Sequence, residues 1–382
     1  MKAWPKVALG ELISRANETA VLDPFEQYHE VTIKLWGKGV LSRGKVMGSD
    51  VVSARRVVRE NQLILSKIDA RNGAIGLVPP ELDGAIVSND FPSFTFNDLE
   101  QCDPAFMGWL VRSTPFVELC KAASEGTTNR VRIKEDRFLD QQITLPPLAE
   151  QQAIVTRLDS LTEKTRQLEA HLDAVERDAE HLLALRFRDA IANTPLRTMA
   201  EIAPVVRREQ RIDLNGSYPE LGIRSFGKGT FHKTPLSGGD VGTKRLFSIE
   251  PGDLLFSNVF AWEGAIAIAQ TEDAGRFGSH RFISCVPDRR LTSAAFLRYY
   301  FLTDEGMLKI SEASPGGAGR NRTLGLEKLM AIEVPIPPQK TQQTFDRLQA
   351  EIAALKTKHT AIRVANAALL AATLERIFQQ AH

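Results

Sequence analysis

Two stretches of the chain carry apolar-leaning residues at alternating spacings of four and three positions. In the first stretch these positions are Ile154, Leu158, Leu161, Thr165, Leu168, Leu172, Val175, Ala179 and Leu182. In the second they are Phe345, Leu348, Ile352, Leu355, His359, Ile362, Asn366 and Leu369. This heptad pattern is typical of coiled-coil helices. We therefore predict two spacer helices that form a coiled coil, over residues 148–194 and 339–382.

Each predicted helix follows a longer block with a different pattern. The blocks at residues 1–147 and 195–338 contain short runs of β-branched and aromatic residues, separated by Gly, Pro, Asn and Asp. Short helices are expected within them over 104–123 and 293–313. A Pro-Pro pair closes each block immediately before its long helix. The predicted fold class is α+β, with two α/β domains separated by two long helices.

The chain repeats itself at a nearly constant offset. The segment 28–39 (YHEVTIKLWGKG) reappears at 218–229 (YPELGIRSFGKG), 190 residues later. Further matches follow in the same order at offsets of 190 to 192, including Leu63-Ile-Leu-Ser66 with Leu254-Leu-Phe-Ser257 and the two Pro-Pro junctions. A shared register over more than a hundred positions indicates an internal duplication.

The charges of the two predicted helices are complementary. Residues 148–194 contain six Lys and Arg against nine Asp and Glu, whereas residues 339–382 contain six against three. Exposed ion pairs are individually weak, so the apolar seam must supply most of the pairing energy. An antiparallel pairing would give the duplicated chain approximate two-fold symmetry. The pattern alone leaves a parallel pairing open.

Composition narrows the class of protein. The three cysteines, Cys102, Cys120 and Cys285, are far apart and form no C-x-x-C pair, which argues against a disulfide framework or a zinc site. No signal-peptide pattern and no run of 18 apolar residues occurs, so a cytoplasmic protein without membrane contact is expected. The net charge of +1 argues against a simple basic DNA-binding module.

The junction at residues 145–155 (LPPLAEQQAIV), followed by a long helix, resembles the boundary between recognition domain and spacer helix in type I restriction-modification specificity subunits. The second junction, 336–343 (IPPQKTQQ), departs from that pattern at Gln339 and Thr341. The domain openings at residues 4–12 and 196–202, and the segment 254–258, are also similar to the family. The resemblance covers essentially the whole chain.

That resemblance implies a non-catalytic subunit that binds a bipartite, asymmetric double-stranded DNA target. Each α/β domain would be a target-recognition domain for one half-site, and the helices would act as a ruler. The partners implied are two methyltransferase subunits and two restriction subunits that translocate DNA. S-adenosylmethionine, ATP and Mg would then belong to these partners, and this chain would hold no cofactor and no metal.

The sequence carries no recognised enzyme motif. There is no G-x-x-x-x-G-K-[ST], no H-E-x-x-H, and no Asn-Pro-Pro or Asp-Pro-Pro followed by an aromatic residue. We therefore expect no catalytic residue. Gly37-Lys-Gly39 and Gly227-Lys-Gly229 are compatible with phosphate binding and equally with a simple turn.

Basic and amide side chains are candidates for DNA contact, because arginine pairs with guanine or phosphate and asparagine with adenine. About half of the candidates are expected to touch DNA, mostly at phosphates; for the clusters around Arg130 and Arg322, a set of surface salt bridges is the alternative. Candidates in the first domain are Lys34, Lys38, Arg43, Lys45, Lys67, Arg71, Asn72, Asn129, Arg130 and Arg132. Candidates in the second are Arg224, Lys228, His232, Lys233, Lys244, Asn258, Trp262, His280, Arg281, Arg320, Asn321 and Arg322.

Aromatic residues at equivalent positions are expected in the core, because duplication preserves packing. This applies to Trp36 with Phe226 and to Phe91 with Phe282. Trp262 has Arg71 as its counterpart, so it is predicted to be a contact or a wedge. The helix histidines are expected to face solvent or the seam.

Two other functions fit a duplicated chain. One is a nucleotide-processing enzyme built from strand-rich domains, and the other is a coiled-coil scaffold that holds two protein-binding domains. The segment 67–72 (KIDARN) differs from its counterpart 258–263 (NVFAWE), although the core motifs match. A scaffold for two copies of one partner would need similar loops, so the divergence favours a reader of two different targets.

Overall fold

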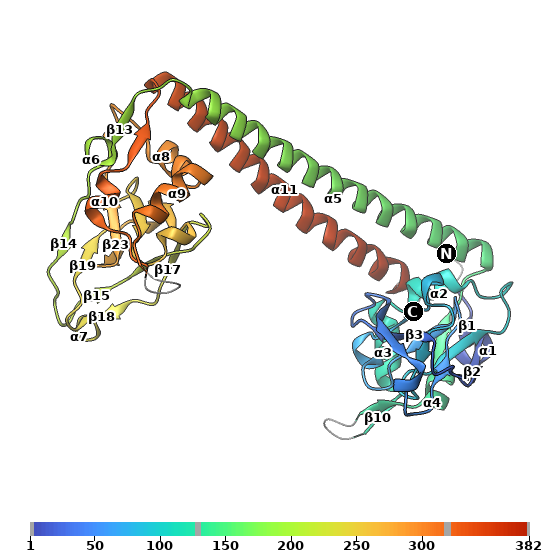
Figure 1. The fold of residues 1–382 in the computed structure, drawn as a ribbon. Coiled ribbons are helices and arrows are strands. Elements are labelled where there is room, and N and C mark those ends of the chain that lie inside the picture. Colours follow the sequence, from blue (N-terminus) through green and yellow to red (C-terminus); the bar gives the residue numbers. More distant parts are fainter. Residues whose placement is uncertain (1–3, 127–130, 317–321, 380–382) are drawn as a thin grey trace. The chain divides into compact units, whose positions relative to one another are not determined.

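The computed structural model describes residues 4–126, 131–316 and 322–379. The chain divides into two compact units, residues 1–173 with 359–382, and residues 174–358. Each unit combines one α/β block with part of both long helices, α5 (Leu148–Ile191) and α11 (Gln339–Gln379). The prediction of a duplicated α+β chain with two long helices is confirmed (Figure 1).

The first unit contains two four-stranded sheets, ordered β2-β9-β6-β7 and β4-β3-β8-β5. Pairing is antiparallel except between β3 and β8. Its strands are β1 (Lys6–Ala8), β2 (Ile13–Ala16), β3 (Gln27–Ile33), β4 (Val40–Met47), β5 (Arg56–Val57), β6 (Leu63–Leu65), β7 (Ile75–Leu77), β8 (Ile86–Val87), β9 (Ser93–Phe96), β10 (Ser124–Glu125), β11 (Arg132–Ile133) and β12 (Gln142–Thr144). Its short helices are α1 (Leu9–Leu12), α2 (Pro104–Leu110), α3 (Thr114–Ala122) and α4 (Glu135–Leu139).

The second unit contains two three-stranded sheets, ordered β21-β20-β23 and β14-β19-β22. Its strands are β13 (Leu196–Thr198), β14 (Glu209–Gln210), β15 (Ser217–Tyr218), β16 (Leu221–Ile223), β17 (Thr230–His232), β18 (Leu236–Ser237), β19 (Leu246–Ser248), β20 (Leu254–Ser257), β21 (Ile266–Ile268), β22 (Phe277–Ser279), β23 (Phe282–Cys285) and β24 (Glu333–Pro335). Its short helices are α6 (Met199–Ile202), α7 (Gly238–Val241), α8 (Ala294–Phe301), α9 (Asp304–Glu312) and α10 (Leu326–Met330).

The duplication extends to strand register. Leu63 of β6 pairs with Leu77 and Phe94, and Leu254 of β20 pairs with Ile268 and Cys285, all 191 positions later. Each of the two helices expected within the blocks is in fact a pair of helices, α2 with α3 and α8 with α9. Ser113 and Thr303 cap the second helix of each pair, and such side chains favour starting a new helix over continuing the old one.

The two long helices run antiparallel in each unit. In the first unit Leu158 of α5 shares a core with Leu374 and Phe378, while Arg363 of α11 pairs with Asp173 at 2.6 Å. In the second unit Phe187 of α5 packs against Phe345 of α11, and Glu180 of α5 pairs with Lys356 of α11 at 2.5 Å. Positions advance along α5 as they recede along α11, so the sequence alternative of a parallel pairing is excluded within each unit.

The predicted heptad positions are wrong by one residue near the end of each helix sequence. Leu182 is exposed and Leu183 packs on the core of the second unit, while Leu369 is exposed and Leu370 packs on the core of the first. A straight α-helix drifts by about 20° per heptad from a 3.5-residue repeat. Near the α/β blocks the helices therefore pack on the blocks as well as on each other.

No helix within the described residues is long and apolar enough to span a membrane.

Candidate nucleic-acid interface

A long β-hairpin in the first unit carries four of the predicted DNA-contact residues. Strands β3 and β4 place Lys34, Lys38, Arg43 and Lys45 on exposed positions. The pairing register shifts between Glu30 and Val31, which leaves Arg43 without a partner opposite it. A bulge of this kind re-aims a side chain. The hairpin therefore presents a row of exposed cations.

The second unit carries the same hairpin in shorter pieces. Strands β15 to β18 place Arg224, Lys228 and Lys233 on exposed positions, 190 residues after Lys34, Lys38 and Arg43. Within the described residues, none of these six side chains is ion-paired with a carboxylate. His232 differs from them, because its Nε2 lies 3.0 Å from the buried carboxylate of Asp273.

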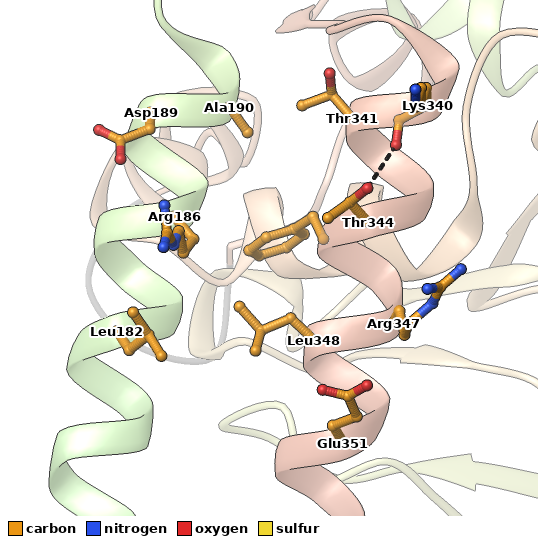
Figure 2. Close-up of a pocket in the computed structure, with 11 residues that line it drawn as sticks. Leu182, Arg186, Asp189, Ala190, Lys340, Thr341, Thr344, Arg347, Leu348 and Glu351 are labelled. Carbon is orange, nitrogen blue, oxygen red and sulfur yellow. Dashed lines mark hydrogen bonds between the residues drawn. The ribbon is translucent and has the colours of Figure 1, made fainter.

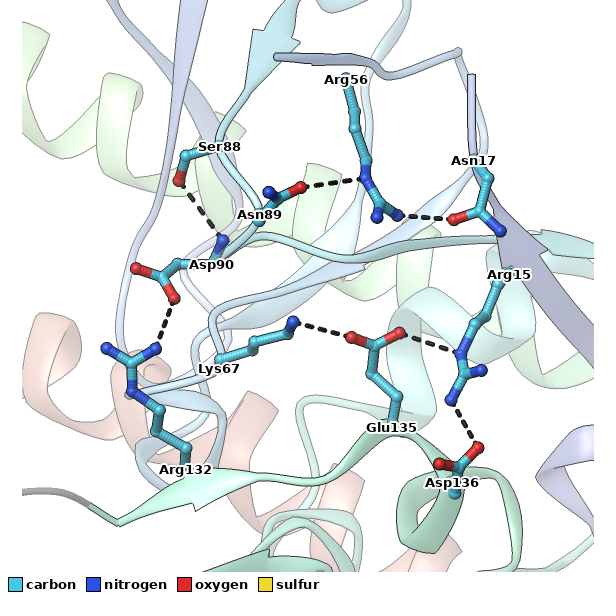
Figure 3. Close-up of polar contacts among 10 residues, drawn as sticks. All are labelled: Arg15, Asn17, Arg56, Lys67, Ser88, Asn89, Asp90, Arg132, Glu135 and Asp136. Atoms are coloured by element: carbon cyan, nitrogen blue, oxygen red, sulfur yellow. Dashed lines mark hydrogen bonds and ion pairs between the residues drawn. The ribbon is translucent and has the colours of Figure 1, made fainter. Parts of the chain in front are cut away.

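A second group of polar side chains in the first unit comes from β2, β11, the start of α4 and the loops that follow β6 and β8 (Figure 3). Glu135 pairs with Lys67 at 2.8 Å and with Arg15 at 2.9 Å, and Arg132 pairs with Asp90 at 2.8 Å. Two predicted contact residues, Lys67 and Arg132, are therefore ion-paired in the free chain. We call Lys67, Asn89, Asp90, Arg132 and Glu135 the divergent cluster of the first unit.

The second unit holds the same backbone framework with different side chains. The N–H of Lys67 donates to the carbonyl of Asp90 at 2.8 Å, and the N–H of Asn258 donates to the carbonyl of Arg281 at 2.7 Å. The N–H groups of Ile133 and Leu324 donate to the carbonyls of Lys67 and Asn258, each at 2.8 Å. These bonds show that equivalent residues of the two units lie 191 positions apart in the sequence. The divergent cluster of the second unit is therefore Asn258, His280, Arg281, Thr323 and Leu326.

Charge is reversed or lost across the divergent cluster. A lysine becomes Asn258, the acid Asp90 becomes Arg281, and Arg132 becomes Thr323. Since the backbone bonds are the same, the fold does not require these changes. The side chains of this cluster therefore differ while the backbone framework is kept.

Other predicted contact residues lie beside this framework. Arg71 and Asn72 follow the divergent cluster on a single 3-10 turn, and Trp262 and Glu263 replace them in the second unit. The guanidinium of Arg322 lies 5.2 Å from the centre of the Trp262 ring and also donates to Ser311. Lys244 is exposed after α7, away from these turns in sequence. The remaining predicted contacts lie outside the described residues: Asn129, Arg130, Arg320 and Asn321.

The expectation of a core role for Trp36 and Phe226 is wrong. Trp36 is 68% exposed and Phe226 is 76% exposed, both at hairpin tips. The same expectation is confirmed for Phe282, which is buried, and for Phe91, which packs on a core cluster. Aromatic residues are thus shared between the repeats at exposed as well as at buried positions, so equivalence alone could not separate the two.

Sequence reasoning missed several polar residues that the fold brings to the first cluster. The guanidinium of Arg56 bonds Asn17 at 2.6 Å and Asn89 at 3.1 Å, and Arg15 bonds Glu135 (Figure 3). Arg15 and Val205 occupy matching positions, because they pair with Phe94 and Cys285 respectively. Comparison of the two repeats at that position would have flagged Arg15 as a divergent surface residue.

The described residues of the second unit enclose a hollow between the two long helices. This hollow, of about 770 Å³, is lined by apolar and charged residues of α5 and α11, among them Leu182, Arg186, Leu348 and Glu351 (Figure 2). Within the described residues, no group of three His, Cys, Asp or Glu is arranged to hold a metal ion. Burial raises the pKa of each cysteine thiol to about 12, which keeps these thiols protonated.

Paired helices, twin α/β blocks and loop clusters that differ on one framework define a duplicated two-domain protein. Residues 1–177 match the family model of the type I restriction modification DNA specificity domain. This part of the chain is similar to that family. The resemblance to type I specificity subunits inferred from the repeated motifs is thereby confirmed. In this family the domain is the specificity component and not the catalytic one.

Two solved structures have the same fold over nearly the whole chain. One is a crystal structure of the HsdS subunit from Thermoanaerobacter tengcongensis, with a TM-score of 0.64, 20% identity, and coverage of 100% of this chain and 98% of that chain. The other comes from work on complex assembly and conformational transition of the type I R-M system, with a TM-score of 0.65, 21% identity, and coverage of 99% and 98%. No curated protein matches this sequence.

Proposed function

We propose that this chain is the subunit that reads an asymmetric, two-part DNA target for a type I restriction-modification complex. Each α/β block reads one half-site, and its divergent cluster supplies the base contacts. The observation that carries the proposal is the divergent cluster itself, in which one backbone framework presents Lys67, Asp90 and Arg132 in one unit and Asn258, Arg281 and Thr323 in the other.

The chemistry of these side chains suits the edges of base pairs. Arginine donates two hydrogen bonds to guanine, asparagine pairs with adenine, and a carboxylate accepts from cytosine. The first cluster offers Arg132 with Asp90, and the second offers Asn258 with Arg281. The two units therefore have the means to prefer different base sequences.

The enzymatic work is assigned to partner subunits. In this proposal the chain recruits two methyltransferase subunits, which use S-adenosylmethionine to methylate adenine, and two restriction subunits, which use ATP and Mg. The chain itself needs no metal or cofactor for reading. A protein that reads cellular DNA works where the DNA is, and we place it in the cytoplasm.

The near-neutral charge of the chain also points to partners. DNA affinity at physiological salt rests largely on phosphate neutralisation, and this chain has a net charge of only +1. We therefore expect weak and strongly salt-dependent DNA binding by the isolated chain. Methyltransferase subunits that close around the duplex would supply the remaining cations.

The proposal is tested by selection of DNA from a random pool with the assembled complex. The expected enriched duplexes share two short sequences separated by a fixed number of unspecified base pairs. Enrichment of one continuous site, or of no site, would refute the proposal. Nanomolar sequence-specific binding by the chain alone in ordinary salt would refute the assignment of phosphate neutralisation to the partners.

We further propose that the paired helices set the spacing between the half-sites. Glu169 of α5 faces Arg363 of α11 at 3.2 Å, so a heptad inserted after each of these residues keeps the seam in register. Seven helical residues add about 10 Å, which equals about three base pairs of B-DNA. The methylated motif should keep both half-sites and lengthen its spacer. An unchanged spacer would contradict the role as a ruler.

A further inference from the structure

The two units share an exposed surface although their divergent clusters differ. We call residues 27–47 and 217–237 the matched hairpins. At an offset of 190 they place Lys34 with Arg224, Trp36 with Phe226, Lys38 with Lys228, and Arg43 with Lys233. Each pair keeps its chemical class, and all eight side chains are exposed.

The tips of the matched hairpins have the same unusual backbone. Trp36 and Phe226 have φ angles of 60° and 61°, in the left-handed region that side-chain-bearing residues rarely adopt. The following glycines, Gly37 and Gly227, have φ angles of 63° and 64°. Strain of this kind persists where the surroundings enforce it and is concentrated at functional sites. An aromatic residue is a costly choice here, because glycine would adopt the conformation freely.

Backbone hydrogen bonds hold each tip against the turn that carries divergent side chains. The N–H of Trp36 donates to the carbonyl of Asn72 at 3.0 Å, and the N–H of Phe226 donates to the carbonyl of Glu263 at 2.8 Å. The N–H of Gly37 donates to the carbonyl of Gly73, and the N–H of Gly227 donates to the carbonyl of Gly264. The exposed ring is therefore positioned beside the turn that follows the divergent cluster.

The rings of Trp36 and Phe226 bury too little area to stabilise the fold as buried aromatic side chains do. Trp36 is 68% exposed and Phe226 is 76% exposed, so neither ring buries most of its area in its own unit. Lys228 holds its Nζ 5.7 Å from the centre of the Phe226 ring. Each tip thus presents a large apolar face flanked by positive charge.

Because both units carry the matched hairpins, the hairpins should contact a part of the DNA that both half-sites share. Two half-sites of different sequence have the same sugar-phosphate backbone. The three matched cations of each hairpin lack carboxylate partners in the described residues and suit phosphates, and a flat ring packs on a sugar or on any base face. We propose that the matched hairpins grip DNA independently of its sequence, with Trp36 and Phe226 as the aromatic contacts. This inference rests on the proposed function.

The test uses the chain assembled with its methyltransferase subunits and fluorescent duplexes carrying the target, or the target with one half-site scrambled. Trp36→Gly and Phe226→Gly remove the rings and relieve the left-handed backbone, so the thermal midpoint should stay equal or rise. Affinity for all duplexes should fall by about tenfold per ring, with the ratio between duplexes unchanged. Trp36→Phe should restore most of the affinity.

Matched variants separate the ring from general effects. Phe25 is also an exposed aromatic residue of the first unit but lies outside the hairpin, so Phe25→Ala should leave affinity unchanged. Lys38→Ala with Lys228→Ala should reduce the slope of log affinity against log salt by about 0.9 for each phosphate that the variant no longer neutralises.

Three results would overturn the inference. Unchanged DNA affinity of the glycine variants would show that the rings do not touch DNA. Release of the methyltransferase subunits by these variants in size-exclusion chromatography would show that the hairpins dock a protein. Altered preference at one base position would show sequence reading. Failure of the proposed function gives a different result from failure of this inference. The unaltered complex would then show no preference for a two-part target.

Discussion

Arg132→Ala gives a sharp test of base reading by the first divergent cluster. Arg132 pairs with Asp90 at 2.8 Å on the surface of the first unit, and Thr323 occupies the matching position in the second. The guanidinium is 51% exposed and the carboxylate 43% exposed, so both groups are accessible to DNA. The substitution removes the cation while the backbone bond between Ile133 and Lys67 stays.

Two magnitudes decide what the substitution should do. An exposed ion pair contributes less than about 1 kcal/mol to folding, so the free energy of unfolding should change little. A bidentate contact from arginine to guanine discriminates by about 1 to 3 kcal/mol, which is about 5- to 150-fold in affinity. The loss in binding should therefore exceed the loss in stability.

The assay measures the affinity of the assembled complex for duplexes with every single base substitution in the two half-sites. Arg132→Ala should flatten the preference at one or two positions of one half-site only. The control is Arg137→Ala, because Arg137 forms an equally exposed pair with Glu125, at 53% and 46% exposed and 2.7 Å. The control should keep the whole preference.

Base reading by Arg132 is refuted if Arg132→Ala weakens binding to all duplexes equally, since that is the behaviour of a phosphate contact. It is also refuted if preference changes in both half-sites, because Arg132 and its partner Asp90 both lie in the first unit. If Arg137→Ala changes the base preference by the same amount, the change results from the loss of surface charge and not from base reading by Arg132.

Two further predictions concern the second unit. Phe187→Ala should lower the free energy of unfolding by about 3 to 5 kcal/mol in urea denaturation, because the ring is buried among Phe345 and other aromatic residues; a loss below about 1 kcal/mol would contradict this packing. Burial raises the pKa of Asp346 above its usual 3.8, so the folded chain binds its proton more tightly than the unfolded chain. Stability is then lost as pH rises above 3.8, so Asp346→Asn should stabilise the chain at pH 7 but not below pH 3.8. Equal urea-denaturation midpoints of the variant and the unaltered chain at pH 7 would contradict this direction of the pKa shift.

Much of the architecture could be predicted from the sequence because long-range order repeats in it. The heptads predicted α5 and α11, and the repeat at 190 to 192 predicted two similar blocks. The breaks at Ser113 and Thr303 were missed because apolar residues continue across each cap. The direction of helix pairing needed the structure, because a heptad seam fits either orientation.

The candidate site was predictable only in part. Lys34, Lys38 and Arg43 could be named from their residue types, but sequence could not show that a bulge exposes Arg43. Trp36 was assigned to the core because conservation between repeats does not distinguish packing from binding. Arg15 was missed because it lies on β2 and meets Glu135 at the start of α4, which is distant in sequence.

In the proposed function, two unlike reading clusters act on one duplex. The decisive measurement maps the methylated adenines of cells that carry this chain with its methyltransferase partner, against cells that lack the chain. We expect an asymmetric motif of two different half-sites with a fixed gap of unspecified bases. A palindromic motif, a continuous motif, or methylation that does not depend on the chain would contradict it.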